Sequence, residues 1–229
     1  MLFRSEFSII VVNTESEEQY RFVDYCITLT PSDNIMKYVI DKTPHIDKIY
    51  NDGTTVLNLA VNWDCSVDVI EHILQRTTNF NIFSHQSYSW KVFKKLCELC
   101  CESDIISDCL IEIVVKYADI YKAKKNLVFA DGCKHIHYAC MFGVPKLVDV
   151  LCKYGSDLES KTRDGKSCMI LACMNNNVHV IDYLIDKNVN IIGEFDNKGT
   201  VLHNISKLLE DNFNIYEKLI KHYASQKQH

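Results

Sequence analysis

The chain lacks the patterns that mark several large classes of protein. No run of 18 apolar residues occurs in its 229 residues, so the sequence predicts no membrane-spanning helix. The N-terminal residues show no charged segment followed by a long apolar run, and we therefore expect no secretory signal. The formal net charge of −5 provides no basic excess, which disfavours a protein that binds nucleic acid.

The motifs of common enzyme classes are missing as well. The sequence contains no Gly-rich phosphate loop and no Gly-x-Ser-x-Gly nucleophile elbow. Its Asp and Glu residues fall mostly at expected turns and helix starts, where capping and helix dipoles account for them. We therefore expect that the protein is not an enzyme and that it uses no cofactor.

Cysteine is abundant, but its spacing does not form a complete site. The eleven cysteines are an odd number, and several lie on the apolar stripe of an expected helix. Cys97 and Cys100, with Cys101 and Cys109 nearby, could form half of a zinc site or a redox pair. Zinc needs a second matched pair and a redox Cys-x-x-C needs a preceding strand, and the sequence shows neither. We expect buried reduced thiols, no bound metal and a cytoplasmic protein.

What the sequence does contain is an internal repeat. The stretch 131–158 returns when the chain is shifted forward by 33 residues. The shift places Gly132 on Gly165, Ala139 on Ala172 and Leu151 on Leu184. A fixed period of this size is typical of a protein built from stacked repeats.

Each repeat carries the start and stop signals of two short helices. Asp131-Gly132 is a tight-turn dipeptide, because Gly accepts a positive φ and Asp bonds its own backbone. Gly143 is placed to end a first helix, Pro145 to begin a second and Gly155 to close it. One such pair cannot bury its apolar stripes alone. The sequence therefore predicts an all-α solenoid of stacked helix-turn-helix units with hairpin-like turns.

The repeat resembles the ankyrin repeat, whose motif is Gly-x-Thr-Pro-Leu-His-x-Ala followed by a second helix. His137 matches the motif histidine, which in this family hydrogen-bonds the turns, and Asn58 replaces it in the copy at 51–82. Asn176 and Asn188 stand where two glycine caps are usual, and we expect them to adopt the same left-handed conformation. The residues that match the motif are Gly53, Leu57, Ala60, Gly132, His137, Ala139, Gly143, Gly165, Ala172, Thr200 and His203.

The resemblance implies one ankyrin-repeat domain over residues 1–229 with about six repeats, some of them degenerate. We expect an N-terminal cap or remnant at 1–13, a degenerate repeat at 14–50, a repeat at 51–82, a degenerate repeat with enlarged loops at 83–129, repeats at 130–162 and 163–195, and a C-terminal capping repeat at 196–229.

The resemblance also implies a binding surface. In the family, partners bind the concave side, which is formed by turn tips and the exposed face of the first helices. Trp63 and Phe142 fall at one position of the repeat, and exposed aromatic residues often anchor interfaces; the alternative is that they pack against the next repeat. The candidate residues are Asn62, Trp63, Met141, Phe142, Met174 and Asn175 at the helix ends and Tyr50, Lys161, Arg163 and Phe195 at the turn tips.

These observations favour a monomeric protein-binding module that acts as a scaffold, an adaptor or a sequestering factor. An alternative is the substrate-recruiting arm of a ubiquitin-ligase adaptor, although the residues after 210 contain no leucine–proline box. A zinc or redox protein that uses the cysteine cluster is a third reading.

Overall fold

In the computed structural model, the described residues are 26–27, 32–43, 46, 54–77, 89–191 and 213–227. Within these ranges the regular elements are helices, together with one isolated antiparallel bridge between Lys161 and Ser167. The chain divides into two compact units, residues 1–95 and residues 96–229.

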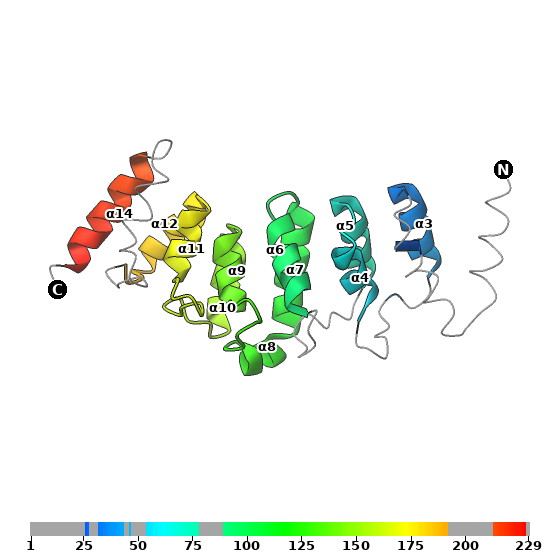
Figure 1. The fold of residues 1–229 in the computed structure, drawn as a ribbon, viewed down its shortest axis with the longest axis horizontal. Helices are drawn as coiled ribbons and strands as arrows, with labels where there is room; N and C mark the ends of the chain where they lie inside the picture. Colours follow the sequence, from blue (N-terminus) through cyan, green and yellow to red (C-terminus); the bar gives the residue numbers. More distant parts are fainter. Residues whose placement is uncertain are drawn as a thin grey trace. The chain divides into compact units, whose positions relative to one another are not determined.

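The described part of the first unit contains α3 (Asp33–Lys42), α4 (Val56–Asn62) and α5 (Val67–Arg76) (Figure 1). Helix α5 packs against both α4 and α3. Thr55 and Asn58 form a capping box at the start of α4, because the Thr55 side chain accepts from the Asn58 N–H and Asn58 Oδ1 accepts from the Thr55 N–H. This capping fixes where the first helix of the repeat begins.

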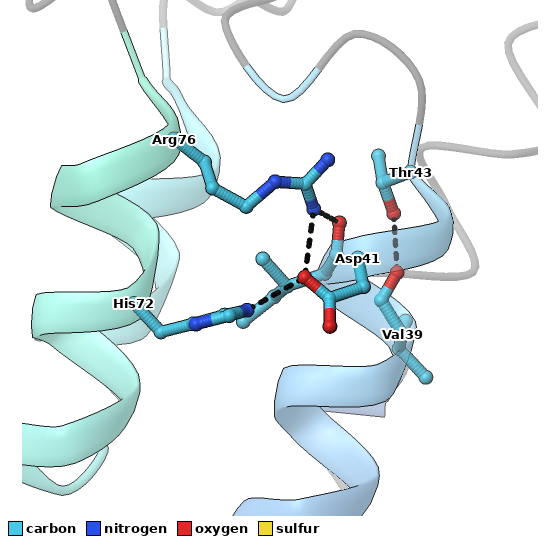
Figure 2. A network of polar contacts seen from close by, with 6 residues as sticks. Val39, Asp41, Thr43, His72 and Arg76 are labelled. Carbon is cyan, nitrogen blue, oxygen red and sulfur yellow. Dashed lines mark hydrogen bonds and ion pairs between the residues drawn. The ribbon is translucent and has the colours of Figure 1, made fainter.

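Polar side chains of α5 bind acceptors at the end of α3. Figure 2 shows the carboxylate of Asp41 with His72 Nε2 at 2.8 Å and Arg76 Nη1 at 3.4 Å. Arg76 also donates to the backbone carbonyl of Ile40, one of the carbonyls that a helix end leaves without a helical partner. The end of α3 is therefore joined to α5 by donors on the later helix, while Lys37 of α3 donates to Asp68 of α5 at 3.1 Å.

Helix α6 (Ser89–Leu99) contains the boundary between the two units. Its apolar stripe, which includes Val92, Phe93 and Leu96, is buried. The apolar residues recur at spacings of one, three and four, which places them on one face of the helix.

The second unit stacks helices in two rows (Figure 1). The first helices α9 (His135–Met141) and α11 (Cys168–Met174) pack on one another. The second helices pack in series, each against the next: α7 (Asp104–Lys116), α10 (Pro145–Lys153), α12 (Val178–Asp186) and α14 (Phe213–Gln226). The all-α solenoid predicted from the 33-residue shift is confirmed.

Residues with positive φ end the helices. The first helices α4, α9 and α11 are followed by Asp64, Gly143 and Asn176, with φ of 52°, 74° and 55°. Gly155 (93°) and Asn188 (55°) play the same part after α10 and α12. The predicted left-handed conformation of the two asparagines is confirmed, since Asn tolerates this region better than other residues with a side chain.

Direct hydrogen bonds join successive repeats of the second unit. The N–H of Arg163 donates to the carbonyl of Gly132 at 3.0 Å, which links two successive turns. The side-chain amide of Asn177 donates to the carbonyls of Cys140 and Met141 at 3.0 and 2.6 Å. Asn177 thus caps the end of α9 from the repeat that follows.

Helix α14 satisfies the backbone that follows α12. His222 Nε2 lies 2.9 Å from the carbonyl of Val189, and the Gln226 amide donates to the same oxygen at 2.9 Å. The Gln226 carbonyl oxygen accepts from the N–H of Ile191 at 3.0 Å. Leu219 is buried beside these contacts. The last described helix therefore acts as a hydrogen-bonding cap on the repeat before it.

One helix was not expected from the sequence. The degenerate repeat at 83–129 was expected to contain enlarged loops, yet α8 (Ala118–Lys124) begins directly after α7. The caps Tyr117 and Lys134 are 17 positions apart, whereas the equivalent caps Tyr154 and Ser167 are 13 apart. The four extra residues amount to about one helical turn, and the chain accommodates them as helix.

Several large apolar residues of the helices are exposed. They are Ile35 on α3, Ile105 on α7, and Phe213 and Ile220 on α14. Ile35, Ile105 and Ile220 each lie next to a buried residue in the sequence, as Ile105 does next to Ile106. Spacing alone predicts a wider apolar stripe than the neighbouring helices cover.

Candidate protein-binding surface

The ends of the first helices present equivalent residues. Trp63, Phe142 and Asn175 are the C-cap residues of α4, α9 and α11, with φ and ψ of −96° and 11°, −100° and 7°, and −105° and 10°. The three side chains therefore leave the backbone from the same local geometry. The sequence placed them at one position of the repeat by counting alone.

These helix ends are where the first helices meet solvent. In α9 and α11 every residue before the final methionine is buried. Met174 is 44% exposed and Trp63 is 49% exposed, whereas Met141 and Phe142 are half-buried. Asn62 and Asn175 are exposed. The described first helices of the second unit thus contribute their last residues, rather than a long face, to the surface.

Hydrogen bonds within the turn that carries Lys161 and Arg163 fix its shape. Ser160 and Thr162 are buried, while Lys161 and Arg163, which alternate with them, are exposed. The Thr162 N–H donates to the Lys166 carbonyl at 2.9 Å, and the Lys166 N–H donates to Thr162 Oγ1 at 3.0 Å. Two exposed cationic side chains therefore belong to a turn that is closed by its own hydrogen bonds.

The preceding turn has the same construction. Phe129 is buried between exposed Val128 and Ala130, and the Phe129 N–H donates to the Cys133 carbonyl at 2.9 Å. Gly132 has a φ of 82°, and a Cβ atom at this residue would lie 2.6 Å from Cβ of Arg163. The two turns are therefore stacked in direct contact.

His137 connects its helix to the next turn. Its Nδ1 accepts from the Lys134 N–H at 3.0 Å, so the proton is on Nε2, which lies 3.1 Å from the Ser160 carbonyl oxygen. Burial lowers the pKa of His137 to about 4, so the ring is neutral. Asn58, at the equivalent position, makes the bond to the N-cap residue Thr55. The turn that follows Asn58 lies outside the described residues.

Aromatic packing and an aspartate fix the start of α9. His135 is buried edge-on against Phe129, with ring centroids 4.7 Å apart, and burial lowers the pKa of His135 to about 3. The Tyr138 hydroxyl donates to Asp131 Oδ2 at 2.7 Å, and the Cys133 N–H donates to Asp131 Oδ1 at 3.1 Å. Both oxygens of the Asp131 carboxylate thus accept hydrogen bonds from nearby residues of the same repeat.

Comparison with protein families agrees with this geometry. The family model described as ankyrin repeats (3 copies) matches residues 99–196 and 136–229, which together cover more than half of the chain. The chain belongs to the ankyrin-repeat family. Repeats of this family generally mediate protein–protein interactions, and they are typically not enzymes. No match to the sequence is found among curated proteins.

The remaining motif residues of this ankyrin-repeat protein divide into two groups. Leu57, Ala60, Ala139 and Ala172 are buried in the helix pairs, and Gly165 has a φ of 79° in its turn. The other predicted residues lie outside the part of the chain that the structure describes: Tyr50, Gly53, Phe195, Thr200 and His203.

Two residues of the ankyrin turns were not singled out from the sequence. Val128 and Ala130 occupy the positions of Lys161 and Arg163 in the preceding repeat, and both are exposed. The 33-residue shift would have identified both.

The thiols are mostly inaccessible. Six of the eleven cysteines are buried, four are half-buried and one, Cys101, is exposed. Burial raises the pKa of Cys100 to about 12 and that of Cys97 well above its usual value. Cys101 donates through Sγ to the Phe142 carbonyl at 2.9 Å. Across the described residues, no group of three or more His, Cys, Asp or Glu side chains is placed to hold a metal ion.

None of the helices in the described ranges is both long enough and apolar enough to cross a bilayer.

Proposed function

We propose that the protein is a non-enzymatic module that binds a partner protein and acts as a scaffold, an adaptor or a sequestering factor. Its binding residues are those at the first-helix ends (Asn62, Trp63, Met141, Phe142, Met174 and Asn175) and those at the turn tips (Lys161 and Arg163, with Tyr50 and Phe195 proposed from the sequence). We call the described members of this set the recognition surface of the unit to which each belongs: Asn62 and Trp63 lie in the first unit, and the others lie in the second.

The observation that supports this proposal is the exposure of large apolar side chains at the ends of otherwise buried helices. Trp63 and Met174 leave almost half of their surface in water, which costs free energy in the unbound chain. Truncation of an exposed Trp in an interface often has a large effect on affinity, and Met adapts its shape to different partners. Trp63 is the C-cap of α4 and Met174 is the last residue of α11, so their backbone is already ordered before a partner binds.

The chain contains matched controls for this proposal. Tyr38 on α3 is 46% exposed and Ile105 on α7 is 44% exposed, close to the values for Trp63 and Met174, but both lie on second helices. The variants Trp63→Ala and Met174→Ala can therefore be compared with Tyr38→Ala and Ile105→Ala.

The test is to capture partners of the full chain from a lysate of its source cells and then to measure the affinity of each variant for the recovered protein. We expect Trp63→Ala and Met174→Ala to weaken binding by about 2 kcal/mol each, which is roughly thirtyfold, and the two controls to change it little. Equal affinities for the test and control variants would contradict the proposed surface.

Phe142 provides a second test of the same surface. Because it is half-buried, Phe142→Ala could lower binding by unfolding the chain. Thermal melting separates the two effects: a reduced affinity at an unchanged melting temperature assigns Phe142 to the interface, and a large drop in melting temperature assigns it to packing between repeats.

A further inference from the structure

We infer that the exposed side of helix α7 binds a second protein segment, an amphipathic helix with cationic side chains at every fourth position. The α7 face consists of Asp104, Ile105, Asp108, Glu112 and Val115. The inference goes beyond the proposed function, because this face lies on a second helix of a repeat and shares no residue with the recognition surface.

The members of the α7 face lie on the side of the helix opposite its buried stripe. The stripe includes Ile106, Leu110 and Val114, which pack in the core of the second unit. With 3.6 residues per turn, the five members of the face fall within about 100° of the helix circumference. All of them are exposed, and the exposed fractions of Ile105 and Val115 are 44% and 47%. The face therefore combines acidic and large apolar side chains in one strip.

The acids of the α7 face have no partner within the protein. In the described ranges, none of their carboxylates forms an ion pair or a hydrogen bond. The acids on the next second helices differ in this respect, since Asp149 lies 2.7 Å from Lys153 and Asp182 lies 2.7 Å from Lys218. The carboxylates of α7 are therefore available to cations of another molecule.

The spacing of these acids destabilises the unbound helix. Asp104 lies in the first turn of α7, where the helix dipole favours an acid. Asp108 and Glu112 lie beyond that turn, and like charges at i, i+4 and i+8 repel one another. Exposed Ile105 and Val115 add apolar surface that is unfavourable in water. A partner that brings both cations and apolar groups relieves both effects.

The lysines near the α7 face do not neutralise it. Lys116 follows the face at the end of α7, and its Nζ lies 5.4 Å from the centre of the Tyr117 ring. Lys153 on the neighbouring helix α10 is paired with Asp149. Lys146 at the start of α10 is exposed, and among the described residues no acid forms an ion pair with it. The face therefore keeps a negative charge, which a cationic partner complements.

The geometry favours a helix as the occupant. Residues at i, i+4 and i+8 form a ridge on a helix, and such a ridge fits the groove between two ridges of another helix. Lys or Arg at i, i+4 and i+8 of the partner repeats at the same interval as the acids, roughly 6 Å. Ile105 and Val115 are about 15 Å apart along the axis, so leucines on either side of the cationic row would cover them.

The experiment uses the full chain and fluorescence anisotropy with two labelled peptides. The aligned peptide is a helix with Arg at i, i+4 and i+8 and a Leu on either side of this row. The dispersed peptide has the same composition, with the Arg residues spread around the helix. Unlabelled spermine serves as a competitor that carries charge without a helical surface. Asp108→Asn/Glu112→Gln is compared with the control Asp164→Asn/Asp186→Asn, which removes the same charge from exposed acids elsewhere in the second unit.

We expect the aligned peptide to bind, the dispersed peptide to bind at least roughly tenfold more weakly, and added salt to weaken the aligned peptide. Asp108→Asn/Glu112→Gln should lose roughly tenfold in affinity for the aligned peptide, and the control should keep it. The melting temperature of Asp108→Asn/Glu112→Gln should not fall, because the substitutions remove repulsion within α7. The loss of affinity is then not a loss of folded protein.

Four results would overturn the inference. They are equal binding of the two peptides, equal loss of affinity in both variants, no binding of the aligned peptide at about 1 mM, and competition by spermine at the concentration at which the unlabelled aligned peptide competes. The last result would mean that the face attracts any polycation and recognises no helix.

Failure of this inference can be distinguished from failure of the proposed function. A captured protein that requires Trp63 or Met174 and binds Asp108→Asn/Glu112→Gln normally would leave the recognition surface in place, and the peptide measurements alone would then decide the α7 face. A captured protein that requires Ile105 and Asp108 but neither Trp63 nor Met174 would support the α7 face and contradict the recognition surface.

Discussion

The Nε2 atom of His137 lies 3.1 Å from the carbonyl oxygen of Ser160, a residue 23 positions further along the chain. The other ring nitrogen accepts from the N–H of Lys134. We expect His137→Ala to lower the free energy of unfolding by about 2 to 4 kcal/mol, because it removes both bonds and opens a cavity. Urea unfolding followed by circular dichroism measures this. His179→Ala, at an exposed position of α12, serves as the control and should change stability by less than about 0.5 kcal/mol.

Two buried histidines should make the fold sensitive to mild acid. Burial lowers the pKa of His135 to about 3 and that of His137 to about 4, below the ordinary value of 6.5. The unfolded chain therefore binds protons first as the pH falls, so the stability that the neutral rings provide is complete above pH 6.5 and is lost as the pH falls toward 4 and then 3.

Between pH 7.5 and pH 5 we expect a loss of about 2 kcal/mol for each of these histidines. Urea midpoints measured across this range test the expectation. His135→Leu should remove about half of the pH dependence, because only His137 then titrates. The same pH dependence in that variant as in the unaltered chain would contradict our assignment.

Gly132 is a position where a methyl group has no room. Its φ is 82°, and a Cβ would approach Cβ of Arg163 to 2.6 Å. We expect Gly132→Ala to cost at least about 2 kcal/mol, from backbone strain and from separation of the two turns. Asn176→Gly, at a φ of 55° after α11, should be neutral or slightly stabilising. An equal drop in melting temperature for Gly132→Ala and Asn176→Gly would contradict this expectation.

The thiols should react in two distinct classes. Cys101 is the exposed cysteine, and six others are buried. A chromogenic disulfide reagent should therefore modify about one thiol rapidly in the native chain and all of them after denaturation. Cys101→Ser should abolish the rapid phase, whereas Cys109→Ser, at a half-buried position, should keep it. A rapid phase that survives Cys101→Ser would mean that another helix opens easily.

Much of the fold could be predicted because equivalent positions of successive repeats adopt the same backbone geometry. The 33-residue period places Gly132 and Gly165 in equivalent turns, and it predicts Asn176 and Asn188 as left-handed caps, in agreement with their φ of 55°. These features depend on one or two residues and their immediate neighbours. Local steric rules are sufficient for them.

The parts that could not be predicted depend on which neighbour covers a residue. Ile105 and Ile106 are adjacent and equally apolar, yet only Ile106 is buried, because α7 turns that side toward α10. The four extra residues between the caps Tyr117 and Lys134 carry no signal that separates a longer loop from another helical turn. The exposed ends of the first helices, such as Met174, follow from the packing of α9 on α11 rather than from their own spacing. Whether those ends bind a partner stays a prediction.

Several hydrogen bonds between successive repeats run in the same direction along the chain. Arg76 donates to the carbonyl of Ile40, Arg163 to that of Gly132 and Asn177 to that of Met141, and in these three contacts the later repeat gives the hydrogen and the earlier one the oxygen. Helix α14 makes both kinds of contact, since the Gln226 amide donates to the Val189 carbonyl and the Gln226 oxygen accepts from the Ile191 N–H. The last repeat of such an array therefore leaves both a carbonyl oxygen and an N–H for its cap, and one amide side chain, which donates and accepts, can serve both.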